Sequence, residues 1–218
     1  MKNILKNHKY ILIFCFVFLA ACTTNTQFKS RDYNAKGEMY LKTEKYAKAE
    51  KYLNKAIEAN PYNLDAYKNR GTLYYARGDY EKALSDFDHV LSYEKHNANV
   101  LAAKGAALAN MGKYTDAYNT LYTSLKLNPS NVAALNSMAG LLFMANDFEK
   151  AKQIYTVSLE YNTTPEAYLM RAKCYEQLGQ TAEAEHDYAL AKLLKLGVGN
   201  TAPEEKDIAS SKNNTENK

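Results

Sequence analysis

The sequence predicts an all-α protein built from five helix-turn-helix units stacked as a solenoid. A pattern of small and large apolar residues recurs about every 34 residues from Ser30 onward, and such a period is the mark of a repeat architecture. The composition agrees, because Ala and Leu are frequent, only four Pro and nine Gly are present, and Val and Ile runs are few beyond the first twenty residues. With 46% hydrophobic and 24% charged residues, the chain has the composition of a folded domain.

Residues 1–21 have the features of a secretory signal peptide. The first nine residues carry three Lys and no acid, and the twelve residues that follow, 10–21, are apolar. Twelve apolar residues are too few for a membrane-spanning helix, which needs roughly 20. An uncleaved transmembrane anchor is therefore the weaker interpretation.

The apolar run ends in Leu19-Ala20-Ala21-Cys22, which resembles the lipobox of bacterial lipoproteins. The resemblance implies cleavage before Cys22 and acylation of its thiol, while ordinary cleavage beside an incidental Cys is the alternative. Thr23, not Asp, follows Cys22, which suggests the periplasmic face of the outer membrane if the cell has one. We therefore expect a lipid-anchored protein of the cell envelope.

Processing at Cys22 would leave a chain with one free thiol and almost no net charge. Cys15 would leave with the signal peptide, so Cys174 would remain alone and no intramolecular disulfide could form. Three of the 28 basic residues lie in the signal peptide, which leaves 25 against 24 acidic residues. Nucleic-acid binding requires a basic surface, so no nucleic-acid partner is expected.

The repeat is clearest in residues 64–97 and 98–131. Positions 4, 11, 17 and 24 hold large apolar residues, positions 8 and 15 hold Gly, and position 20 holds Ala. In the first of these segments the residues are Tyr67, Gly71, Tyr74, Gly78, Tyr80, Ala83 and Phe87, and in the second they are Leu101, Gly105, Leu108, Gly112, Tyr114, Ala117 and Leu121. Further copies span residues 30–63, 132–164 and 165–198, where Glu44 and Asn146 replace the turn Gly of two units.

This pattern resembles the tetratricopeptide repeat (TPR). The resemblance implies a right-handed superhelical solenoid of five repeats, preceded by a tether over residues 22–29. Small residues at positions 8 and 20 would let the two helices of each unit cross closely, and Gly at position 15 would end the first helix in a left-handed conformation. Residues 199–218 are too polar to pack and are expected to form a disordered tail.

No catalytic or metal site is predicted. His89, His96 and His186 lie on or after second helices without a partner at metal-ligand spacing, so we expect them on solvated surfaces. Cys174 occupies a position that is apolar in the other repeats and is expected to be buried. Neither an enzymatic activity nor a cofactor is expected.

The first helices of the repeats are expected to line a concave groove that binds an extended or helical peptide. The lining residues predicted to make polar contacts are Lys68, Asn69, Tyr75, Asn99, Asn110, Asn136 and Lys173, and the predicted apolar anchors are Phe143, Met144, Leu169 and Met170. The alternative is that these residues are only the solvent-facing side of a scaffold. The clamp with which some relatives grip a C-terminal carboxylate is not matched beyond Lys68, because Thr72 and Ala103 stand at two of its positions.

The last repeat ends with Leu190, Leu193 and Leu194 and no following amphipathic helix. This edge either frays or forms a homodimer or partner surface. The favoured function is a scaffold for envelope proteins or peptides, by analogy with TPR lipoproteins such as the pilotins of type IV pilus secretins and the adaptors of cell-wall hydrolases. A self-associating structural lipoprotein that uses the exposed edge is the alternative.

Overall fold

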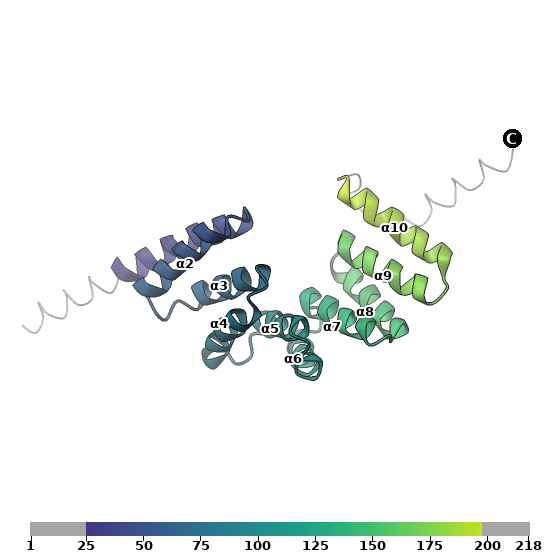
Figure 1. The fold of residues 1–218 in the computed structure, drawn as a ribbon, viewed down its shortest axis with the longest axis horizontal. Coiled ribbons are helices and arrows are strands. Elements are labelled where there is room, and N and C mark those ends of the chain that lie inside the picture. Colours follow the sequence, from purple (N-terminus) through teal and green to yellow (C-terminus); the bar gives the residue numbers. More distant parts are fainter. Residues whose placement is uncertain (1–24, 198–218) are drawn as a thin grey trace, which may run out of the picture. The chain divides into compact units, whose positions relative to one another are not determined.

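In the computed structural model, the described residues are 25–197, and this range contains helices joined by short turns and no strand. A first helix covers residues 25–42. The helices that follow (Figure 1) are α2 (Tyr46–Ala59), α3 (Leu64–Ala76), α4 (Tyr80–Tyr93), α5 (Ala98–Asn110), α6 (Tyr114–Leu127), α7 (Val132–Met144), α8 (Phe148–Tyr161), α9 (Pro165–Gln177) and α10 (Thr181–Lys195). The all-α solenoid of helical hairpins predicted from the repeat is confirmed.

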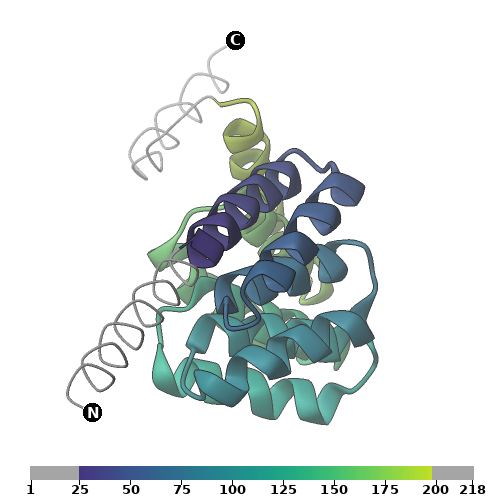
Figure 2. The same ribbon diagram turned by 90° about the vertical axis from the view of Figure 1, so that its left-hand side faces the viewer.

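The described chain forms two compact units, which cover residues 25–111 and 112–197. Within each unit, consecutive helices run antiparallel and pack side by side, as for α3 and α4 or α9 and α10 (Figures 1 and 2). The division falls in the turn between α5 and α6, inside the segment 98–131.

Side-chain caps determine where the first helix of a repeat begins. The residue before α3, α5, α7 and α9 accepts a hydrogen bond from the backbone N–H three residues later, and this cap satisfies an amide that the helix itself leaves unpaired. The cap residues are Asn63 before α3, Asn97 before α5, Asn131 before α7 and Thr164 before α9.

The turns within the hairpins require a left-handed backbone conformation. Gly78, Gly112 and Gly179 have φ angles of 80°, 76° and 74°, as their position in the repeat predicted. Glu44 and Asn146 adopt the same conformation, with φ angles of 55° and 60°. The turn geometry is therefore retained where the sequence departs from Gly, although a side chain disfavours this conformation.

The core of unit 25–111 depends on small residues at the helix crossings. A Cβ atom on Gly71 of α3 would lie 2.6 Å from the Phe87 ring of α4, so only Gly permits this approach. Ala83 is buried beside Phe87 in the same cluster. In unit 112–197 the equivalent core forms around Tyr155 and Cys174.

One boundary differs from the prediction, since residues 25–29, assigned to the tether, are helical. They contain neither Gly nor Pro, so nothing in them stops the helix from extending before Ser30. The signal peptide, Cys22 and the tail 199–218 lie outside the described residues. Among residues 25–197, no helix is long and apolar enough to span a bilayer.

Candidate peptide-binding surfaces

A polar cleft of about 350 Å³ lies in unit 25–111, between the helix over residues 25–42 and the start of α3. Its lining residues are Gln27, Arg31, Asn34, Asn60, Tyr62, Asn63, Leu64, Asp65 and Glu94. Arg31 is exposed and makes no ion pair with any residue between 25 and 197. The cleft therefore offers both a free guanidinium and carboxylates to a polar partner.

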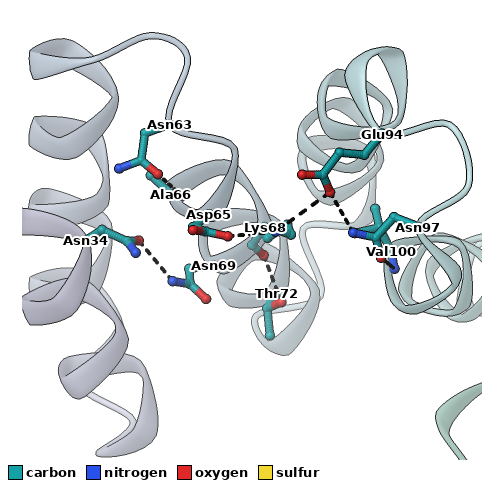
Figure 3. Close-up of polar contacts among 10 residues, drawn as sticks. All are labelled: Asn34, Asn63, Asp65, Ala66, Lys68, Asn69, Thr72, Glu94, Asn97 and Val100. Atoms are coloured by element: carbon teal, nitrogen blue, oxygen red, sulfur yellow. Dashed lines mark hydrogen bonds and ion pairs between the residues drawn. The ribbon is translucent and has the colours of Figure 1, made fainter. Parts of the chain in front are cut away.

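Lys68, a predicted lining residue, is engaged by two acids beside this cleft (Figure 3). Its Nζ lies 2.6 Å from Oδ1 of Asp65 and 3.8 Å from Oε2 of Glu94. The same Glu94 oxygen accepts a hydrogen bond of 2.7 Å from Nδ2 of Asn97. Because its charge is balanced within the protein, Lys68 is poorly suited to hold a carboxylate of a partner.

The other predicted polar residues of this unit connect neighbouring first helices. Nδ2 of Asn69 donates to Oδ1 of Asn34 at 2.9 Å (Figure 3), and Nδ2 of Asn110 donates to the Tyr75 hydroxyl at 3.1 Å. Asn99 is exposed near the start of α5. Nδ2 of Asn110 also donates to the Ala106 carbonyl at 2.9 Å. Asn69 and Asn110 thus support the packing of successive repeats.

The four predicted apolar anchors of unit 112–197 do not gather in one pocket. Phe143 packs edge-on against Phe148, with ring centroids 5.2 Å apart, and contacts the core cluster that Met170 also contacts. Leu169 packs instead on the cluster that contains Leu190. Only Met144 is largely exposed, at 59%.

The two predicted polar residues of this unit differ from each other. Oδ1 of Asn136 accepts a hydrogen bond of 2.7 Å from the Ser158 hydroxyl of α8, so the amide is directed at the partner helix of its own hairpin. Lys173 is exposed on α9.

A second cleft, of about 420 Å³, lies between α6 and α7. Its lining residues are Tyr114, Thr115, Tyr118, Leu141, Leu142, Met144 and Ala145. Met144 is the one member of this set among the predicted groove residues. The Tyr residues were overlooked because they lie on a second helix, although exposed aromatic residues one helical turn apart were a signal that could have been used.

The last edge is less exposed than predicted. Leu190 is 8% exposed and packs on Tyr168 and Ala191, with Leu194 partly buried against the same cluster. Leu193, at 41%, is the member of the predicted trio that remains available. The antiparallel packing of α10 on α9 covers the other two.

Two Arg–Asp ion pairs that were not predicted from the sequence link the helices of a hairpin, one between α3 and α4 and one between α9 and α10. Arg70 on α3 bonds both carboxylate oxygens of Asp86 on α4, and the partner carboxylate raises the pKa of Arg70. Arg171 on α9 repeats the arrangement with Asp187 on α10. Each Arg also lies over two Tyr rings, which are Tyr67 and Tyr74 for the first and Tyr168 and Tyr175 for the second. The spacing of Arg at position 7 and Asp at position 23, found in both repeats, could have revealed these pairs.

The histidines and the free thiol of Cys174 differ in how their surroundings compare with the prediction. His96 and His186 are exposed, but His89 is half-buried and stacks on Tyr67 with ring centroids 3.9 Å apart, so the expectation of a solvated position was wrong for His89. Cys174 is buried as predicted, and burial raises its pKa to about 11, which keeps the thiol protonated at neutral pH. No group of three metal-binding side chains occurs within residues 25–197.

Helical hairpins stacked through small residues, with clefts between neighbouring repeats, define a helical-repeat protein. Family models described as tetratricopeptide repeat match residues 32–93, 108–169 and 165–195. The chain therefore belongs to the tetratricopeptide repeat family, as the sequence pattern predicted. These matches together extend over both units of the described chain.

Individual relatives are distant. Tetratricopeptide repeat protein 6 of Homo sapiens is 30% identical over 61% of this chain and 26% of its own length, and heat shock protein STI1 of Saccharomyces cerevisiae is 25% identical over 59% and 22%. The chain thus spans less than a third of either relative. The solved structure of Pseudomonas aeruginosa pilF superposes with a TM-score of 0.67 at 21% identity, covering 82% of this chain and 80% of that one. This likeness shows the fold.

Proposed function

We propose that the chain is a lipid-anchored TPR scaffold that binds proteins or peptides of the cell envelope during the assembly of envelope machinery. The observation that carries this proposal is the sequence Leu19-Ala20-Ala21-Cys22 at the end of a basic and apolar leader, directly before a family of repeats that binds proteins. A helix that is present from residue 25 leaves little chain between Cys22 and the repeats. A scaffold anchored so closely would meet partners at the membrane surface, on the periplasmic face of the outer membrane if the cell is Gram-negative.

The anchoring part is tested by lipid labelling. Cells grown with a radiolabelled or alkyne-bearing palmitate analogue should incorporate the label into the wild-type protein and not into a Cys22→Ala variant. The variant should also leave the membrane fraction, because stable anchoring depends on the acyl chains. Equal labelling and equal fractionation of the two proteins would contradict the lipid anchor.

The binding part is tested by crosslinking in intact cells. A photo-crosslinking residue is placed at Asn34, which lines the polar cleft, or at Met144, which lines the cleft between α6 and α7. Lys51, exposed on α2 and outside both clefts, is the matched control position. We expect specific envelope proteins to be captured from Asn34 or Met144 and identified by mass spectrometry. Capture of the same proteins from Lys51 alone would contradict a role for the clefts.

Binding of a chaperone tail is not part of the proposal, although one relative is a heat shock protein by name. The carboxylate clamp of such relatives would need several cationic and amide residues, and only Lys68 matches. Lys68 is already paired with Asp65 and Glu94, so its charge is compensated.

A second candidate function, self-association through the last repeat, is favoured by one observation. Leu193 and Leu196 expose apolar side chains at the end of α10. Light scattering of the purified protein would decide, since a monomer at high concentration would exclude this function. A dimer disrupted by Leu193→Glu would support it.

A further inference from the structure

The junction between α6 and α7 lacks a side-chain link that is present at two other repeat junctions, α2–α3 and α8–α9. At the α2–α3 junction, Glu50 accepts a hydrogen bond of 3.1 Å from the Tyr74 hydroxyl and pairs with Arg77 at 2.6 Å. At the α8–α9 junction, the Nζ of Lys152 lies 5.5 Å from the centre of the Tyr175 ring. Both links start from position 21 of one repeat and reach position 11 of the next.

Tyr118 occupies position 21 in the third repeat, where the first repeat has Glu50, the second Leu84 and the fourth Lys152. The residues opposite, at positions 11 and 14 of the next repeat, are Leu142 and Ala145, in place of a Tyr and an Arg at the α2–α3 junction. Neither Leu142 nor Ala145 offers a polar group in its side chain, and Ala145 is short. A cleft of about 420 Å³ lies at this junction, and Tyr118, Leu142 and Ala145 all line it.

The cleft is apolar and uncharged, and its polar side-chain groups are hydroxyls. Tyr114 and Tyr118 are 50% and 47% exposed, and the hydroxyls of Tyr114, Thr115 and Tyr118 make no hydrogen bond with residues 25–197. A partner that covers these rings must supply acceptors, because a buried hydroxyl without a partner is costly. It must also be uncharged where it contacts the cleft, because no counter-charge lines it.

We propose that this cleft binds a proline-rich segment of a partner protein in the polyproline II conformation. The backbone carbonyls of such a segment are free acceptors for the three hydroxyls, whereas proline has no N–H that would need an acceptor. Its rings supply the uncharged apolar surface that packs on Tyr114, Tyr118 and Met144. An amphipathic helix fits less well, since its carbonyls are already used within the helix.

The charges near the cleft agree with this assignment. Lys150, which follows α7 on the next helix, is paired with Asp147 at 2.7 Å. The pair is internally neutral, which agrees with an uncharged partner, although the Lys150 ammonium also interacts electrostatically with Tyr118. The inference deepens the proposed function and rests on it, because it names the chemistry of one partner site.

The test measures fluorescence anisotropy of a labelled decaproline peptide titrated with the detergent-solubilised full chain. We expect saturable binding that Tyr118→Ser weakens by at least about tenfold, which corresponds to the loss of one good aromatic contact. Tyr161→Ser is the matched control, because Tyr161 is equally exposed on α8 but lies outside the cleft. The control should bind the peptide as the wild type does.

A double variant, Tyr118→Glu with Ala145→Arg, guards against a simple folding defect. It installs the acid and the guanidinium that close the α2–α3 junction at the same repeat positions, so the fold should be retained while the cleft is filled. Circular dichroism should show an unchanged unfolding transition, and peptide binding should be lost.

The proposal would be overturned by the absence of saturable decaproline binding, or by an equal loss of binding in Tyr161→Ser. Displacement of decaproline by a leucine-bearing amphipathic helix that binds more tightly would also overturn it. A concentration-dependent dimer that Tyr118→Ser abolishes would also overturn it in favour of a second copy. In-cell crosslinking from Asn34, run in parallel, separates this inference from the proposed function. Persistent capture of envelope proteins without decaproline binding would remove the inference alone.

Discussion

Arg70 and Asp86 form a bidentate ion pair that links α3 to α4 within one hairpin. Nε of Arg70 lies 2.8 Å from Oδ2 of Asp86, and Nη2 lies 2.7 Å from Oδ1. Nη1 of Arg70 also donates to Oδ1 of Asn54 in the preceding repeat, at 2.8 Å. The guanidinium therefore joins the two helices of one repeat to the second helix of the repeat before it.

Removal of the acid from this pair should destabilise the protein strongly. Asp86→Ala leaves a partly buried guanidinium, 20% exposed, without its counter-charge, which costs about 3 kcal/mol of unfolding free energy. The double variant Arg70→Met with Asp86→Leu should recover most of that loss, because an apolar pair of similar volume needs no compensation. Urea denaturation of the single and the double variant measures both the loss of stability and its recovery. Lys36→Ala, which removes an exposed pair with Asp32, is the control and should leave the midpoint unchanged.

Two helical glycines should respond in opposite directions to Ala. Gly71→Ala places a Cβ 2.6 Å from the buried Phe87 ring and should cost about 1–2 kcal/mol through overpacking. Gly140→Ala places its Cβ 3.7 Å from the Tyr155 hydroxyl, an ordinary contact, and should stabilise the protein by about 0.5 kcal/mol because Ala favours helices. Thermal unfolding of the two variants measures whether each substitution raises or lowers the stability. Destabilisation of both would contradict the difference in helix spacing at Gly71 and Gly140.

Replacing the non-glycine residues in the left-handed turn positions by Gly should increase the stability of the protein. Glu44→Gly relieves a left-handed conformation at φ 55° and should raise the unfolding free energy by about 0.5–1 kcal/mol. Asn146→Gly should have a smaller effect, because Asn tolerates this conformation better than Glu. Glu44→Ala separates backbone from charge effects, and a gain equal to that of Glu44→Gly would attribute the stabilisation to the lost charge.

Stability should fall at alkaline pH as the core thiol ionises. Burial raises the pKa of Cys174 from 9.0 to about 11 and that of Tyr155 well above its ordinary value. A group whose pKa is raised on folding stabilises the fold below its unfolded pKa, and this contribution is lost as the pH rises through its folded pKa. The unfolding free energy should therefore decrease from about pH 9 to about pH 11.

Urea titrations at about pH 8 and about pH 10.5 measure this loss. Cys174→Ala has no thiol to ionise, so it should lose less stability over this interval than the wild type. Identical losses in the two proteins would show that Cys174 does not contribute.

The spacing of small residues along the sequence was enough to predict the repeat architecture of this protein. Small residues at positions 8 and 20 and Gly at position 15 are local requirements of a helical hairpin, so the repeat could be predicted from one chain. Cys174 was placed correctly because its position is apolar in the other repeats. The lipid anchor at Cys22 stays a prediction, because Cys22 lies outside the described residues.

The candidate sites could be predicted only in part, because a repeat position specifies a helix face and not what the side chain meets across it. Lys68 was selected as a free groove lysine, but Asp65 and Glu94 hold it. Met144 was selected together with Phe143, but only Met144 reaches a cleft.

The sequence by itself determined the all-α class, the repeat length and the residues that close each hairpin, since these depend on contacts within about 34 residues. Only the tertiary structure decided which of the remaining side chains bond or pack against a neighbouring repeat and which line a cleft where a partner could bind. Asn69 and Asn136 bond neighbouring helices, whereas Tyr118, unremarked in the sequence, faces an open cleft beside Leu142. The physical reason is that burial and hydrogen bonding at a junction depend on two repeats at once, so one repeat's pattern cannot reveal where a junction is left open.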